Sequence, residues 1–139
     1  MPRLLDVQRY GVPGRHNLMW GESGEGEAID ASGLHLIPGL VDLCCNPGFP
    51  GFPQRESPRT LAAAALAGGF TDLLLSPSVD PVVDTPEQIP VHDGSEGPRR
   101  WTAAALTPGL HGKDLAELGL MLRAGAVALS DGSVPIAST

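Results

Sequence analysis

The sequence predicts an α/β fold made of parallel βαβ units over residues 39–139. Four apolar runs typical of buried strands begin near Leu40, Phe70, Trp101 and Ala126. Segments with helical patterns separate most of these runs, so that strands recur at intervals of roughly 30 residues, the length of a βαβ unit. Strands that alternate with helices in this way favour a parallel sheet with helices packed against it.

The first βαβ unit is the clearest in the sequence. Residues 40–44, Leu-Val-Asp-Leu-Cys, form a short apolar run that predicts a strand. An alanine-rich helix is expected over residues 57–67, with Ser57 as its N-cap and Gly68-Gly69 as its stop. Residues 70–75, Phe-Thr-Asp-Leu-Leu-Leu, predict the second strand, which begins directly after the two glycines.

The second unit lacks the helix that a crossover between parallel strands normally contains. Residues 85–89 have a helical pattern for a single turn, but Pro90 stops it and a polar stretch follows to Arg100. We therefore expect at most one turn of helix between the second strand and the third strand, which is predicted over residues 101–106.

A second helix is predicted over residues 113–123, where Leu115, Leu118 and Leu122 fall on one face. Gly125 follows it, and residues 126–129 predict the fourth strand. The chain is thus expected to have two parts. Residues 1–38 form a short β-rich lead of strands and turns without a core of their own, and residues 39–139 form the α/β portion.

Composition limits the classes of function. The chain has 139 residues, enough for one ordinary domain, and its net charge of -7 disfavours binding to nucleic acid or to an anionic membrane. The longest apolar run is far shorter than the roughly 20 residues of a membrane helix, and no signal-peptide core follows Met1. The sequence therefore predicts a cytoplasmic protein, in which the adjacent Cys44 and Cys45 stay reduced.

Several sequence blocks, in order, resemble the dihydroorotase branch of the amidohydrolase superfamily. They are Ile-Asp-Ala-Ser-Gly-Leu-His-Leu-Ile-Pro-Gly-Leu-Val-Asp-Leu at 29–43, Ala-Gly-Gly-Phe-Thr at 67–71, Ser-Pro-Ser-Val-Asp-Pro at 76–81, Ala-Leu-Thr at 105–107 and Gly-Ala-Val-Ala-Leu-Ser-Asp at 125–131. The resemblance implies a (β/α)₈ barrel of the TIM type. Because such a barrel takes ~250 residues, this chain is expected to form about its first four strands.

The resemblance also implies a chemistry. Active members of the family carry zinc, which generates hydroxide near neutral pH, and they hydrolyse a cyclic amide in pyrimidine synthesis. A His-x-His pair at the end of the first strand supplies two ligands, because residues i and i+2 share a face. Here Cys44 and Asn46 occupy these positions. Gly48 replaces the arginine that binds the substrate carboxylate, Ser78 replaces a substrate-binding asparagine, and Asp131 keeps a ligand residue used by some members.

These substitutions predict that no zinc site forms. Cys44, Asn46 and Asp131 would make a rearranged site, since thiolate and carboxylate both bind zinc, but asparagine is a poor ligand. We expect Cys44 to behave as a small buried hydrophobe instead. The histidines are scattered singly and are expected in solvated turns and loops: His16, His35, His92 and His111. The sequence therefore predicts no catalytic residue, no metal or substrate ligand and no cofactor.

Three functions are compatible with the resemblance. The favoured one is a catalytically inactive dihydroorotase-like protein, since some bacteria carry such chains as noncatalytic partners of aspartate transcarbamoylase that support its assembly. Open sheet edges also favour a partner or self-association. The second is a fragment of a zinc-dependent cyclic amidohydrolase, whose later histidine ligands and catalytic aspartate would fall beyond Thr139. The third is a degenerate remnant that does not fold stably alone.

The loop of residues 49–53, Phe-Pro-Gly-Phe-Pro, replaces a substrate loop of the family with apolar and rigid residues. Two interpretations are equally open: the phenylalanines form an interaction loop for a partner, or they fill the vacated active site. Exposed aromatic rings would favour the first interpretation.

Overall fold

The computed structural model describes residues 3–9, 15–19, 28–90 and 97–137. The chain divides into two compact units, Met1–Pro38 and Gly39–Thr139. The first unit is a small sheet around β1 (Arg3–Arg9). This strand pairs antiparallel with β2 (Arg15–Met19) and parallel with both β3 (Ala28–Asp30) and β4 (His35–Leu36). His16 and His35 therefore lie in strands, which corrects the prediction of turns and loops for these two histidines.

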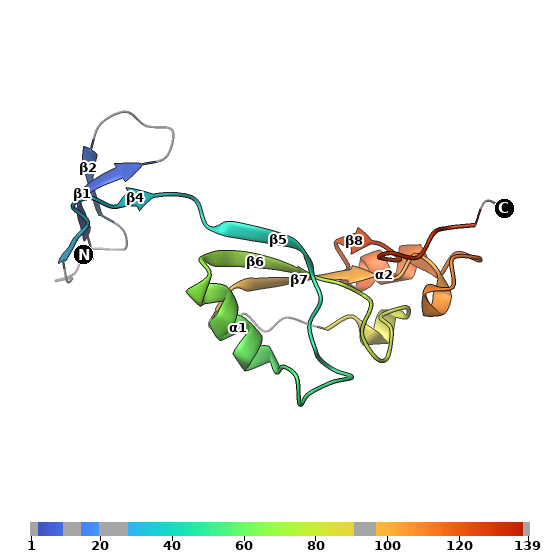
Figure 1. Cartoon of the computed structure of the whole chain (residues 1–139). Helices are drawn as coiled ribbons and strands as arrows, with labels where there is room; N and C mark the ends of the chain where they lie inside the picture. Colours follow the sequence, from blue (N-terminus) through green and yellow to red (C-terminus); the bar gives the residue numbers. More distant parts are fainter. Residues whose placement is uncertain (1–2, 10–14, 20–27, 91–96, 138–139) are drawn as a thin grey trace. The chain divides into compact units, whose positions relative to one another are not determined.

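The second unit contains a parallel four-stranded sheet. Its strand order is β5 (Leu40–Cys45), β6 (Phe70–Leu75), β7 (Arg99–Ala104) and β8 (Ala128–Leu129). All three neighbouring pairs are parallel, and the curled sheet carries helices against it (Figure 1). This arrangement confirms the predicted α/β class and the partial barrel. A TIM-type barrel closes with eight strands, so the four strands make half of its inner wall.

Helix α1 (Pro58–Ala67) has the limits that its local sequence predicts. The Ser57 hydroxyl accepts a hydrogen bond from the Thr60 backbone N–H at 3.2 Å, and the Thr60 hydroxyl oxygen accepts one from the Ser57 N–H at 2.9 Å. This reciprocal capping box satisfies two backbone donors that would otherwise lack a partner at the helix N-terminus. At the other end, the Gly68 N–H donates to Ala64 O, and β6 begins after Gly69.

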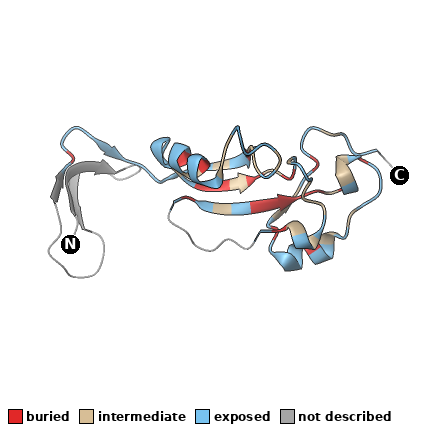
Figure 2. Ribbon diagram, turned by 90° about the horizontal axis from the view of Figure 1, so that it is seen from below, coloured by how far each residue is buried: buried red, intermediate tan, exposed pale blue. Residues whose placement is uncertain are grey.

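The core of the second unit lies between the sheet and its helices. Leu61 and Ala65 of α1 form a buried cluster with Cys45, Leu73 and Leu75 of β5 and β6. Figure 2 shows buried residues where α1 meets the sheet and along β7. Because successive strand residues point to opposite faces, Leu73 and Leu75 face α1, and Asp72 faces the other side of the sheet, the interior of the half-barrel.

In its described residues, the segment between β6 and β7 contains only the short helix that the sequence predicts. A 3₁₀ turn, η1 (Pro86–Gln88), follows Thr85, and the Gln88 side-chain oxygen accepts from the Thr85 N–H at 2.9 Å. In the described part of this crossover, residues 76–90 and 97–98, no α-helix covers the outer face of β6 and β7.

Helix α2 (Leu118–Ala124) begins five residues later than the predicted start at residue 113. The Ala116 N–H donates to Leu106 O at 3.0 Å, and this contact holds the preceding segment out of a helix. The predicted face is also wrong. Leu115 and Leu122 are exposed, whereas Met121 is fully buried and packs in a cluster with Ile89, Ala104 and Ala126. Leu118 packs partly against this cluster, as expected.

The limits of three strands also differ from the prediction. β5 extends one residue further, to Cys45, and β8 begins at Ala128 because the Ala126 N–H still donates to Met121 O at the end of α2. β7 begins two residues earlier and ends two residues earlier than predicted. Arg99, which looks like part of a polar loop in the sequence, is held in β7 by an ion pair with Asp72 at 2.8 Å.

The buried carboxylate of Asp72 in β6 accepts hydrogen bonds from two side chains of β7. Arg99 Nη2 and Trp101 Nε1 each donate a hydrogen bond to it at 2.9 Å. These donors lower the pKa of Asp72 from 3.8 to about 2. A carboxyl group whose pKa falls on folding stabilises the fold above its unfolded pKa, and this contribution is lost as the pH falls from about 4 toward 2.

We therefore expect the free energy of unfolding to fall when the pH is lowered through this window, and Asp72→Asn to lose that part of the pH dependence. Urea denaturation between about pH 2 and pH 5 measures it. The control is Asp114→Asn, since Asp114 is exposed. A pH dependence that is the same in Asp72→Asn as in the parent chain would contradict this assignment.

Within the described ranges, no helix is both long enough and apolar enough to cross a bilayer.

Candidate functional site

A polar cavity of about 340 Å³ lies where β5 and β6 end. It is lined by Asn46, Pro47, Gly48, Phe52, Arg55, Glu56, Ser78 and Val79. The carboxyl ends of the strands are the face on which TIM-type barrels carry their active sites. The structure thus brings together three of the five positions singled out from the sequence, Asn46, Gly48 and Ser78, and does not place Cys44 or Asp131 in the described lining.

Cys44 is exposed and its neighbour Cys45 is buried, which corrects the expectation that Cys44 is a buried hydrophobe. Cys45 packs with Leu61 of α1 and with Leu73, whereas Cys44 lies outside this buried cluster. The pairing of β5 with β6 is irregular between Asp42 and Cys45. Asn46 is exposed as well.

The two thiols should differ in reactivity. Burial, together with the negative charges of Asp42 and Glu56, raises the pKa of Cys45 to about 11. Since the thiolate is the reactive form, we expect a thiol reagent such as iodoacetamide to modify Cys44 rapidly in the folded chain, and Cys45 only after unfolding. Mass spectrometry of peptides measures both sites, with Cys44→Ser as the control. Equal labelling of the two cysteines under native conditions would contradict the burial of Cys45.

Asp131 forms hydrogen bonds that connect two segments of the second unit. It is 5% exposed, and its Oδ1 accepts hydrogen bonds from the backbone N–H groups of Leu106 and Thr107 at 2.7 and 2.9 Å. The Thr107 hydroxyl donates to its other oxygen, Oδ2. These contacts join the segment after β8 to the end of β7. Both carboxylate oxygens are therefore occupied by protein donors.

The residues present do not fit a catalytic zinc ion. Such a site needs three protein ligands from His, Cys, Asp or Glu around an open position. Among the described residues, no group of three such side chains is placed to hold a metal. His35 and His111 are exposed, and His92 falls outside the described residues.

Arg55 and Glu56 are cavity residues that sequence reasoning missed. The Arg55 guanidinium lies over the Phe52 ring at 5.5 Å from its centroid, a cation–π arrangement. Glu56 Oε2 accepts from the Gly48 N–H at 3.3 Å, which holds the loop after β5 against the start of α1. Their position directly before the Ser57 N-cap was the only signal in the sequence, and it does not indicate which way the side chains point.

The two phenylalanines of the loop at residues 49–53 differ in environment. Phe49 is half-buried and packs against the cluster under α1. Phe52 is 44% exposed and lines the polar cavity. Neither interpretation from the sequence therefore holds for both rings: Phe52 has the exposure that favours an interaction loop, and Phe49 contributes to the core of this chain.

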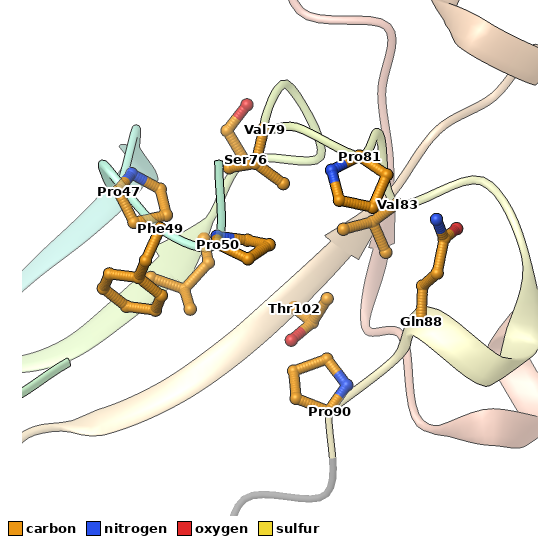
Figure 3. Close-up of a pocket in the computed structure, with 11 residues that line it drawn as sticks. Pro47, Phe49, Pro50, Ser76, Val79, Pro81, Val83, Gln88, Pro90 and Thr102 are labelled. Atoms are coloured by element: carbon orange, nitrogen blue, oxygen red, sulfur yellow. The ribbon is translucent and has the colours of Figure 1, made fainter. Parts of the chain in front are cut away.

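A second cavity, of about 330 Å³, lies beside β6 and β7, and its described lining is mostly apolar (Figure 3). Leu75 and Thr102 contribute from the two strands, and Figure 3 shows Phe49 and four prolines arranged around it: Pro47, Pro50, Pro81 and Pro90. This is the outer face of the sheet that lacks a covering α-helix in the described crossover. The cavity contains no charged side chain among its described lining residues, so it offers no group for acid–base chemistry.

Comparison with known proteins identifies relatives. No protein-family model matches the chain. Dihydroorotase from Streptococcus pyogenes serotype M3 is 36% identical over 121 residues, which is 85% of this chain and 29% of the relative. Dihydroorotase from Syntrophotalea carbinolica is 36% identical over 119 residues, 83% of this chain and 28% of the relative. Dihydroorotase from Pelotomaculum thermopropionicum is 40% identical over 113 residues, which is 79% of this chain and 26% of the relative.

These similarities show that the chain is dihydroorotase-like in sequence over most of its length. The chain spans less than a third of the length of these curated relatives.

Proposed function

We propose that this dihydroorotase-like chain is a noncatalytic protein of pyrimidine biosynthesis that associates with aspartate transcarbamoylase. The proposal rests on the residues found at the end of β5. There the positions of two zinc ligands hold Cys44 and Asn46, and the cavity beside them contains Gly48 where the substrate carboxylate would need an arginine.

The chemical consequence of these replacements is large. A metal site that hydrolyses an amide lowers the pKa of bound water from 15.7 to about 7, which increases the fraction of hydroxide near neutral pH by roughly eight orders of magnitude. Asn46 is a poor zinc ligand, and the Asp131 carboxylate already accepts three hydrogen bonds from Leu106 and Thr107. The side chains at these positions are therefore unsuited to holding the ion that supplies this chemistry.

Phe52 and Arg55 support a binding role for the same region. The ring is 44% exposed, and the guanidinium lies over it. Aromatic and arginine side chains supply much of the energy of protein–protein interfaces when they become buried there. We propose that this pair is part of the surface that contacts aspartate transcarbamoylase.

Size-exclusion chromatography with light scattering tests the association, with the chain and aspartate transcarbamoylase from the same organism run alone and mixed. We expect a stoichiometric complex that Phe52→Ala weakens. Leu66→Ala is the matched control, because Leu66 is 55% exposed on α1, which packs through Leu61 and Ala65. Separate elution of the two parent proteins would overturn the association. Turnover of dihydroorotate by the purified chain with added zinc would overturn the noncatalytic role and favour the hydrolase alternative.

A further inference from the structure

The apolar cavity beside β6 and β7 is built from the middle of the chain. Its floor contains Leu75 and Thr102, which are both buried and lie side by side in the parallel register of the two strands. Figure 3 shows Phe49 on one side of the cavity and Val83 on the other. All of the described lining falls within residues 47–102, so the cavity forms without residues near either end of the chain.

Backbone hydrogen bonds hold the walls of this cavity in place. The Ser76 N–H donates to Cys45 O at 2.8 Å, which joins the segments that follow β5 and β6. Val83 is held at both of its backbone groups. Its N–H donates to Pro77 O at 3.2 Å, and its oxygen accepts from the Ala105 N–H at 2.7 Å. The cavity is therefore preformed in the folded chain, as binding sites for small molecules usually are.

The described lining selects against charged molecules. It contains no charged side chain, and two of its polar side chains already bind the protein backbone. The Gln88 side-chain oxygen accepts from the N–H groups of Asp84 and Thr85, each at 2.9 Å. The Ser76 hydroxyl oxygen accepts from the Ser78 N–H at 3.2 Å. A charged ligand would lose its hydration in this cavity and gain no opposite charge from the described lining, which is costly.

The volume of the cavity sets the size of the ligand. An apolar protein cavity of about 150 Å³ is enough to bind benzene, and this cavity has about 330 Å³. It therefore has room for about two fused rings by the same measure. Phe49 and the prolines of the lining present flat apolar surfaces against which such rings can pack.

We propose that this cavity binds a small, uncharged aromatic molecule of two fused rings. Indole is a suitable probe, because it is uncharged and has this size. The inference goes beyond the proposed function and does not depend on it, since the cavity lies on the outer face of the sheet and the proposed contact with aspartate transcarbamoylase involves Phe52 and Arg55, which are not in its described lining.

Isothermal titration calorimetry of the chain with indole tests the proposal. We expect saturable binding at a single site. Indole-3-acetate has the same ring system with an added carboxylate, and we expect it to bind at least about tenfold more weakly, because the carboxylate must be desolvated at the cavity.

A variant that fills the cavity tests the location of the site. Val83→Phe places a larger side chain in the lining and should weaken indole binding by about tenfold or more. Val127→Phe is the matched control, because Val127 is 53% exposed and is not in the described lining. We expect its affinity to stay within about twofold of the parent value. Circular dichroism checks that each variant is folded, and Val79→Phe replaces Val83→Phe if that variant does not fold.

Three results would overturn the proposal. The first is the lack of saturable indole binding at millimolar concentration. The second is equal affinity for indole and indole-3-acetate, which would contradict the uncharged class of ligand. The third is unchanged affinity in the folded cavity-filling variant, which would place the bound indole outside this cavity. Because aspartate transcarbamoylase is absent from the titration, its outcome is separate from that of the proposed association.

Discussion

Replacing Asp131 by alanine is expected to lower the free energy of unfolding by about 3–5 kcal/mol. The buried carboxylate accepts hydrogen bonds from the N–H groups of Leu106 and Thr107 and from the Thr107 hydroxyl. Alanine would leave these three donors without their partner, and each unsatisfied buried group costs about 1–3 kcal/mol. Equilibrium urea denaturation followed by circular dichroism measures the loss.

The matched control for this variant is Asp114→Ala, which removes an exposed carboxylate from the same unit. We expect its unfolding free energy to stay within about 0.5 kcal/mol of the parent value. If Asp131→Ala were as stable as the control, its carboxylate would not have the structural role assigned to it, and a functional role for this aspartate would have to be reconsidered.

Replacing Met121 by alanine has the second largest expected effect, a loss of about 2–5 kcal/mol. Met121 is fully buried in the cluster of Ile89, Ala104 and Ala126, so truncation leaves a cavity between α2 and the sheet. Thermal and urea denaturation of the variant measure the change. The effect is large because a chain of this size has a total stability of only about 5–15 kcal/mol.

Leu122→Ala is the control for the same helix, because Leu122 follows Met121 directly but is 48% exposed. We expect it to lower the unfolding free energy by less than half of the loss in Met121→Ala. The opposite order, with Leu122→Ala more damaging, would show that the face predicted from the leucine spacing, and not the observed one, packs against the sheet.

Elements determined by local interactions could be predicted from the sequence. α1 and β6 follow from Ser57, the run of alanines and Gly68-Gly69, which all act within a few residues of the element they limit. The single turn in the crossover follows equally from Pro90. The periodicity of the sequence predicts a parallel sheet but does not distinguish a partial barrel from an open sheet. The partial barrel was predicted from the resemblance in sequence blocks.

Features determined by contacts between distant residues were missed. Arg99 belongs to β7 because of Asp72, 27 residues earlier in the chain. The role of Asp131 depends on Thr107, 24 residues away. The pairing of β5 with β6 is irregular between Asp42 and Cys45, so alternation does not assign the two thiols, and packing against α1 buries Cys45. Arg55 and Glu56 could not be predicted as cavity residues, because their positions depend on contacts with Phe52 and Gly48 in the folded chain.

Zinc content shows whether the side chains at the end of β5 can hold a metal ion. The purified chain is incubated with zinc, passed through a desalting column and measured by inductively coupled plasma mass spectrometry. We expect no stoichiometric zinc in the parent chain and no difference in Cys44→Ser. Stoichiometric zinc that is retained by the parent chain and lost in both Cys44→Ser and Asp131→Asn would contradict this expectation, because these residues would then form a working metal site.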